Sequence, residues 1–252
     1  MTDRWRVGAN LATLANALLG VGAILYTLAG NKLWAMLLIA IAIGFDGLDG
    51  MLSRRSPAPP SSFGRLADSL ADALTFGLAP AFLIAVHTND PSTWHPYLGL
   101  AVGLAGAYAA AAFARLTYFT VRTHALPEFR GVPTPESALA LIVVLLFHDV
   151  PAFQGVQPVG VFVGVAILSV MMVVPVPYPK IRRGAWLRWP SAATAVFAAI
   201  ALVTLQFRPA SGSTLDLVAE GAAYAMLVGV ASYYLVGPFT TRRGRRASAG
   251  DR

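Results

Sequence analysis

The chain has 252 residues, of which 56% are hydrophobic and only 12% are charged, whereas an average soluble domain is about 25% charged. This composition argues against a water-soluble globular protein, and the absence of cysteine excludes disulfides, thiol catalysis and thiolate metal sites. The net charge of +7 is spread over loops between apolar runs, which favours adhesion to anionic lipid headgroups and argues against nucleic acid as a partner.

Apolar runs that approach the length needed to cross a bilayer recur along the chain. They predict an all-α, polytopic membrane bundle of eight helices, at residues 10–29, 33–53, 65–87, 95–118, 134–148, 157–176, 188–207 and 215–238. No low-complexity linker or convincing repeat divides these runs, so we expect one membrane domain over residues 1–252. The four histidines match no motif and are expected at the surface; they are His87, His95, His124 and His148.

Lysine and arginine in the loops predict the orientation of the bundle, because cytoplasmic loops are enriched in these residues. Of the 19 basic residues, 17 lie on one side of the predicted membrane, and only Lys32 and Arg208 lie on the other. With an even number of spans, both termini are therefore expected in the cytoplasm, in an integral inner-membrane protein.

Four aspartates interrupt the apolar pattern around the loop at 56–64. Asp46 and Asp49 come near the end of the second predicted helix, and Asp68 and Asp72 near the start of the third. At about 1.5 Å of rise per residue, two antiparallel helices bring all four carboxylates to a similar level in the cytoplasmic leaflet. Spacings of three and four residues keep each pair on one helix face.

Such a cluster needs a counter-charge, since each charged side chain in a membrane helix costs about 2.5–3.5 kcal/mol on insertion scales. Hard divalent cations prefer carboxylate oxygen, so the cluster indicates a site for Mg²⁺ or Mn²⁺, with two ions suited to displacement at phosphorus. Two other interpretations remain open: an ion-coupled transporter, because intramembrane acids also mark ion pathways, and acids that only cap helices or share protons.

The spacing of these residues resembles the motif of the CDP-alcohol phosphotransferase family, D-x2-D-G-x2-A-R-x8–9-G-x3-D-x3-D. The matching residues are Asp46, Asp49, Gly50, Ser53, Arg54, Gly64, Asp68 and Asp72, with Ser53 in place of the alanine. The resemblance implies transfer of a phosphatidyl group from a CDP-linked lipid to the hydroxyl of a small alcohol, with release of CMP. It also implies two divalent ions at the diphosphate, and it suggests a homodimer.

The same resemblance implies roles for individual residues. Asp46, Asp49 and Asp68 would act mainly as metal ligands. Asp72 would be the general base for the alcohol and could also touch a metal. Gly50 and Gly64 would let the CDP-lipid lie against backbone, and Arg54 would reach its nucleotide or phosphates.

Residues outside the motif bear on the acceptor alcohol. The stretches at 111–119, 129–138 and 174–180 resemble those of bacterial integral-membrane phosphatidylserine synthases, with Glu136 where a small residue is usual. This resemblance covers a core at 10–180, or six helices, and leaves two additional helices at 188–238. It implies CDP-diacylglycerol and L-serine as substrates. Glycerol 3-phosphate and inositol phosphate remain alternative acceptors.

Two further groups of polar residues are candidates for binding. Arg115, Arg122 and Arg130 could pair with the carboxylate of serine, because arginine binds carboxylates in a bidentate manner; they could also be solvated topology charges. On the first helix, Asn10, Thr13 and Asn16 recur every three residues. They could contact the cytidine diphosphate or form hydrogen bonds between helices.

Overall fold

The computed structural model describes residues 3–57, 61–87, 97–122, 129–149, 158–174, 177–178, 196, 198–206, 218 and 221–234. The named helices are α1 (Arg4–Leu28), α2 (Lys32–Arg55), α3 (Ser62–Asp72), the π-helix η1 (Ala73–Leu78), α4 (Ala79–His87), α5 (Leu98–Arg122), α6 (Thr134–Asp149) and α7 (Pro158–Val173). Residues 198–206 and 221–234 are also helical. Within these ranges the strands are β1 (Phe129–Arg130) and β2 (Pro177–Tyr178), which pair antiparallel.

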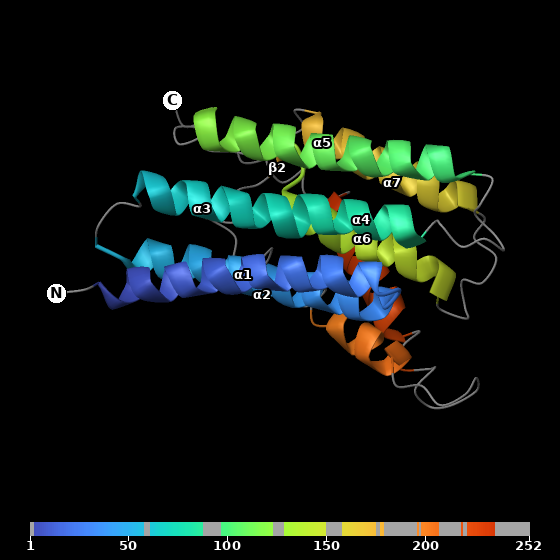
Figure 1. Ribbon diagram of the computed structural model, residues 1–252, viewed down its shortest axis with the longest axis horizontal. Coiled ribbons are helices and arrows are strands. Elements are labelled where there is room, and N and C mark those ends of the chain that lie inside the picture. Colours follow the sequence, from blue (N-terminus) through green and yellow to red (C-terminus); the bar gives the residue numbers. More distant parts are fainter. Residues whose placement is uncertain are drawn as a thin grey trace, which may run out of the picture.

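The helices lie side by side as a bundle of long rods (Figure 1). α3, η1 and α4 follow one another as a single rod that packs on both α1 and α5, while α7 packs against α5 and α6. Four segments are long and apolar enough to cross a membrane: Arg4–Leu28, Lys32–Arg55, Ser62–His87 and Leu98–Tyr118. They coincide with the first four predicted spans.

The remaining predicted spans are matched less completely. α6 and α7 fall at the predicted fifth and sixth spans but are shorter apolar helices. The helical residues 198–206 and 221–234 fall within the predicted seventh and eighth spans. The helical membrane bundle is therefore confirmed, while the number of crossings and the division into six core helices and two additional ones stay predictions.

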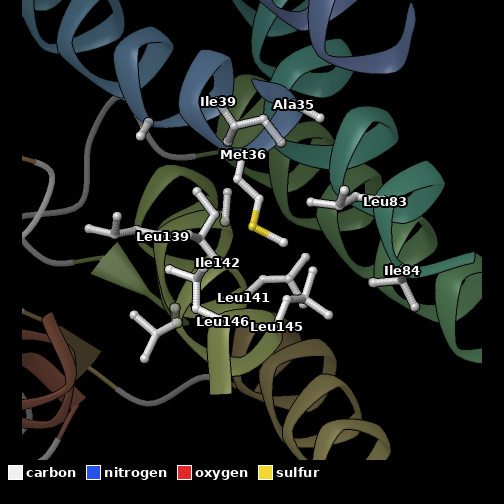
Figure 2. Packing of buried hydrophobic residues seen from close by; sticks show 14 of the residues in the cluster. Ala35, Met36, Ile39, Leu83, Ile84, Leu139, Leu141, Ile142, Leu145 and Leu146 are labelled. Carbon is white, nitrogen blue, oxygen red and sulfur yellow. The ribbon is translucent and has the colours of Figure 1, made fainter. Parts of the chain in front are cut away.

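The apolar core lies where α2, α4 and α6 meet (Figure 2). Met36 of α2 points between Leu83 of α4 and Ile142 of α6, and all three side chains are fully buried. This packing fixes the part of the bundle farther from the aspartates and sets the position of α6 against the α2 and α4 rods.

The two faces of α1 differ in the size of their side chains. The face toward the bundle carries mostly small residues: Ala9, Ala12, Asn16, Gly20, Ala23 and Thr27 are all buried. The opposite face carries Leu11, Leu14, Leu18 and Leu25, which are 55–63% exposed. Small residues permit close helix packing and exposed leucines suit contact with lipid, so α1 has the character of a lipid-facing helix at the edge of the bundle.

Gly20 marks the closest approach of α1 to η1. A Cβ atom at this position would lie 2.3 Å from the Thr75 hydroxyl oxygen and 2.9 Å from the Thr75 Cα. The Thr75 hydroxyl donates a hydrogen bond of 2.9 Å to the backbone carbonyl of Asn16, one turn earlier on α1. Glycine therefore allows the polar part of α1 to lie directly against the rod that carries Asp72.

One sequence prediction about the surface is wrong. His87, expected there, is only 1% exposed at the end of α4. The residue follows an apolar helical run whose packing against the bundle covers its end, which position in the sequence alone did not reveal. Of the other histidines, His95 and His124 lie outside the described residues, and the side chain of His148 is not described.

The start of α6 is anchored to the end of α7. Gly131 has φ = +80°, and a Cβ there would lie 2.3 Å from the carbonyl oxygen of Met172. The Val132 amide donates a hydrogen bond of 3.1 Å to the carbonyl of Met171, and β1 and β2 pair beside it. Only glycine adopts this left-handed conformation without strain, so the chain enters α6 at a defined position.

Candidate active site

Three of the four aspartates converge at one point between α2 and α3. Asp46, Asp68 and Asp72 each offer a carboxylate oxygen, and these three oxygens lie within 4.8 Å of one another. Asp68 and Asp72 are four residues apart on α3, so their side chains leave the same face of that helix, toward Asp46. A set of carboxylate oxygens this close matches the preference of hard divalent cations such as Mg²⁺, so the residues present fit the metal that the sequence predicts.

Asp49, the fourth aspartate, is held by hydroxyl groups. It is buried, and it accepts hydrogen bonds of 2.5 Å from the Thr13 hydroxyl and 3.2 Å from the Ser53 hydroxyl. Its charge also acts on Asp68. Asp49 thus borders the three clustered carboxylates, with its orientation fixed by α1 and by its own helix.

Asp72 receives a hydrogen bond across the interface with α1. The Asn16 side-chain amide donates to Oδ1 of Asp72 over 3.0 Å. Asp72 is also the last residue before η1, and single π-turns inside α-helices are frequent at functional sites. The Asp72 carboxylate is therefore oriented by the buried amide of Asn16, and its backbone lies where the helix changes from α to π geometry.

The motif glycines and Arg54 lie near the end of α2 and the start of α3. Gly50 faces the Arg54 side chain, with the position of a Cβ 3.3 Å from an Arg54 guanidinium nitrogen. The Gly64 amide donates to the Ser61 hydroxyl over 3.0 Å at the start of α3. Arg54 and Asn10 are exposed, so both are accessible from outside the bundle.

Arg115 is buried on α5 and interacts electrostatically with the aspartate cluster. Its guanidinium donates a hydrogen bond of 3.5 Å to the Thr134 hydroxyl, and its charge attracts those of Asp46, Asp72 and Glu136. The structure therefore brings one of the three predicted acceptor arginines to the site. The backbone of Arg122 ends α5 and that of Arg130 forms β1, but their side chains lie outside the described part of the chain.

Comparison with protein families identifies the chain. The family model described as CDP-alcohol phosphatidyltransferase matches residues 6–175, which include all four aspartates. The chain belongs to this family. The membership confirms the resemblance seen in the aspartate motif, and it favours a transferase over the ion-coupled transporter.

Individual members of the CDP-alcohol phosphatidyltransferase family are similar to the chain over much of their length. The CDP-diacylglycerol–serine O-phosphatidyltransferase of Bacillus subtilis strain 168 is 30% identical over 178 residues, which cover 69% of this chain and 91% of that protein. The protein of the same name from Helicobacter pylori strain J99 is 29% identical over 185 residues, covering 70% and 73%. An archaetidylserine synthase of Methanothermobacter thermautotrophicus strain Delta H is 30% identical over 173 residues, covering 68% and 69%.

The sequence did not predict that two residues outside the family motif would lie near its aspartates in space. Asn16 appeared only as one of three polar residues on the first helix, and its contact with Asp72 depends on how α1 packs. Glu136 appeared only as an acid where a small residue is usual, and the structure places it in the first turn of α6. Its proximity to Asp46 was not foreseen, although an acid in an otherwise apolar segment was a usable indication.

Proposed function

We propose that this member of the family transfers the phosphatidyl group of CDP-diacylglycerol to the hydroxyl of L-serine, forming phosphatidylserine and CMP. The proposal depends on one observation: the names of the similar proteins all refer to serine, the acceptor alcohol. The names of the Bacillus and Helicobacter proteins and of the archaeal protein differ in their lipid but all contain serine. The part common to these proteins and to this chain is therefore best explained by a serine acceptor.

Asp46, Asp68 and Asp72 would hold Mg²⁺ or Mn²⁺, because their oxygens lie within 4.8 Å of one another. Asp49 would complete the charge around the site, and two ions would fit the combined set of four carboxylates. When bound, the ions neutralise the diphosphate and stabilise the departing phosphate oxygen of CMP. Hydrogen bonds from Thr13, Ser53 and Asn16 fix Asp49 and Asp72, so these carboxylates would hold the ions, and through them the diphosphate, in one orientation.

Asp72 is the candidate general base. The serine hydroxyl oxygen would form a bond to the phosphorus of the phosphatidyl group, the bond from that phosphorus to the CMP oxygen would break, and Asp72 would accept the hydroxyl proton. The hydrogen bond from Asn16 keeps one carboxylate oxygen oriented, which leaves the other oxygen to face the acceptor.

The CDP-lipid would lie over the glycines of the motif. Gly50 and Gly64 allow close approach to backbone, and the exposed Arg54 could pair with the nucleotide or its phosphates. Asn10 and Thr13 remain proposed contacts of the same ligand. The Thr13 hydroxyl already donates its proton to Asp49, so it would contact the ligand as a hydrogen-bond acceptor.

The decisive experiment offers the purified protein CDP-diacylglycerol with one acceptor at a time and identifies the lipid product. Phosphatidylserine formed from L-serine, together with stoichiometric CMP, is the expected result. Product from glycerol 3-phosphate or inositol phosphate without product from serine would overturn the acceptor. An absence of CMP release with every acceptor would overturn the transferase reaction itself.

We also propose the cellular setting of this reaction. The distribution of basic residues favours an inner-membrane protein with both termini in the cytoplasm and with the aspartates in the cytoplasmic leaflet. The family resemblance supports a homodimer. A catalytic core at 10–180 with two additional helices at 188–238 remains the simplest division of the chain.

A further inference from the structure

Glu136 is a partly buried acid near Asp46 that the family motif does not include. It lies in the first turn of α6, and its charge acts on Asp46 more strongly than that of any other residue near it. Its Oε2 atom is buried and accepts no hydrogen bond from the residues that the structure describes. A buried, unsatisfied carboxylate oxygen is costly, so its presence calls for a physical reason.

Stabilisation of the helix terminus does not supply that reason. A glutamate in the first turn of a helix interacts favourably with the helix dipole, but a solvated side chain would gain this stabilisation without burial. The side chain instead extends toward the interior, where Asp46 repels it. The position therefore costs stability unless a cation joins the site.

Arg115 provides only part of the compensating charge. The arginine attracts Glu136, and it also attracts Asp46 and Asp72. Its guanidinium is tied to Thr134, two residues before Glu136, by a hydrogen bond of 3.5 Å. One guanidinium is thus shared among several carboxylates, and one oxygen of Glu136 remains available for a donor.

The two charges are also held in fixed positions. Gly131, with its positive φ, and the bond from Val132 to Met171 set the point at which α6 begins. Thr134, the residue to which Arg115 donates, is fully buried in the first turn of α6. Two different helices therefore present a cation that acts on Asp72 and Asp46, from α5, and an anion that acts on Asp46, from α6.

We infer that Glu136 and Arg115 form a recognition site for a zwitterion, in which Glu136 accepts hydrogen bonds from the ammonium of the acceptor and Arg115 donates to its carboxylate. This inference rests on the proposed function and specifies its acceptor subsite. In L-serine the ammonium and carboxylate share one carbon and the hydroxyl is on the next, so the first two groups would hold the third near Asp72.

The same arrangement would exclude phosphorylated alcohols. Glycerol 3-phosphate and inositol phosphate carry added negative charge and no ammonium, so Glu136 would repel them and keep its own oxygen unsatisfied. Discrimination built on a buried unpaired group is strong, because an analogue that lacks the matching donor leaves that group without a partner.

The test compares L-serine with 3-hydroxypropanoate, which has the same hydroxyl and carboxylate but lacks the ammonium. Initial rates of CMP release are measured for the wild type, Glu136→Gln and Glu136→Asp, each at varied acceptor and at varied CDP-diacylglycerol. Glu136→Gln should raise the KM for serine by about 10- to 100-fold, the usual effect of losing a charged hydrogen bond. The KM for CDP-diacylglycerol should stay within a factor of about two, a margin well below that effect.

The preference for serine over 3-hydroxypropanoate decides between recognition and a merely structural role. It should fall at least about tenfold in Glu136→Gln and be largely retained in Glu136→Asp, which keeps the charge. An equal loss on both acceptors, or an unchanged preference in Glu136→Gln, would overturn the subsite. If Glu136→Gln does not fold, Glu136→Met, which is similar in length and uncharged, takes its place, and the same loss of preference for serine is expected. Failure of the wild type to use serine would instead refute the proposed function.

Discussion

Replacing Asn16 with leucine should impair catalysis while leaving the bundle folded. Asn16 donates to Asp72 over 3.0 Å, and its other side-chain atom, Oδ1, is buried and accepts no hydrogen bond from the described residues. Leucine has the same branching but no polar atom, so the change removes one good hydrogen bond and one unsatisfied acceptor together. The bond from Thr75 reaches the backbone carbonyl of Asn16 and would persist.

The expected magnitude follows from the charge of the acceptor. A hydrogen bond to a charged group contributes about 1.5–3 kcal/mol, and about 1.4 kcal/mol corresponds to a factor of ten. If the bond orients Asp72 for proton transfer, turnover should fall about 10- to 100-fold. The KM for CDP-diacylglycerol should change little, because the carboxylates that face the diphosphate all remain.

Steady-state CMP release measures this effect, with thermal unfolding in detergent as the measure of stability. Thr27→Val is the matched control, since Thr27 is also buried on α1 but donates only to Ala23 within its own helix. The control should turn over at the wild-type rate. Wild-type turnover in a folded Asn16→Leu protein would refute the idea that α1 orients the base.

Three further outcomes are expected. Chelation with EDTA should abolish CMP release, and Mg²⁺ or Mn²⁺ should restore it better than the larger Ca²⁺; full activity in metal-free buffer would contradict the metal site. Asp72→Asn should lower turnover by a factor of about 10²–10⁴ while CDP-diacylglycerol still binds. Asp46→Asn should weaken the binding of CDP-diacylglycerol as well as turnover. An equal loss of binding in both variants would mean that Asp72 is chiefly a metal ligand. Cysteines introduced at Ser62 and Thr88 in this cysteine-free chain should be labelled from opposite sides of the membrane, and labelling from one side would contradict the predicted topology.

The long helices and the aspartate cluster could be predicted because they depend on local pattern. Length and hydropathy define the first four spans without knowledge of their partners. The depths of Asp46, Asp68 and Asp72 follow from helix rise and the loop between them, and the structure does bring these three side chains together. Their relative level required no information about the rest of the bundle.

The surroundings of the cluster depend on contacts between distant helices and were not predictable in the same way. The bonds from Thr13 to Asp49 and from Asn16 to Asp72 require a particular rotation of α1, which the close approach at Gly20 sets. The position of Glu136 depends on how α6 is anchored to α7. The burial of His87 depends on the packing of α4 in the same way. None of these follows from the periodicity of a single helix.

The π-helix at Ala73–Leu78 lies between two parts of one rod that face different partners. A uniform α-helix would have to bring both parts to their partners with a single angular repeat. Each residue of an α-helix advances the chain by about 100° around the axis. A wider turn therefore resets the angular phase between Asp72, which must face α1, and Leu83 and Ile84, which must face the core. Deleting one residue from Ala73–Leu78 would leave the aspartate motif and the hydropathy of the segment intact, yet it would turn one of these two faces away from its partner. The length of this turn, more than its composition, is thus the property that homologous chains would have to keep constant.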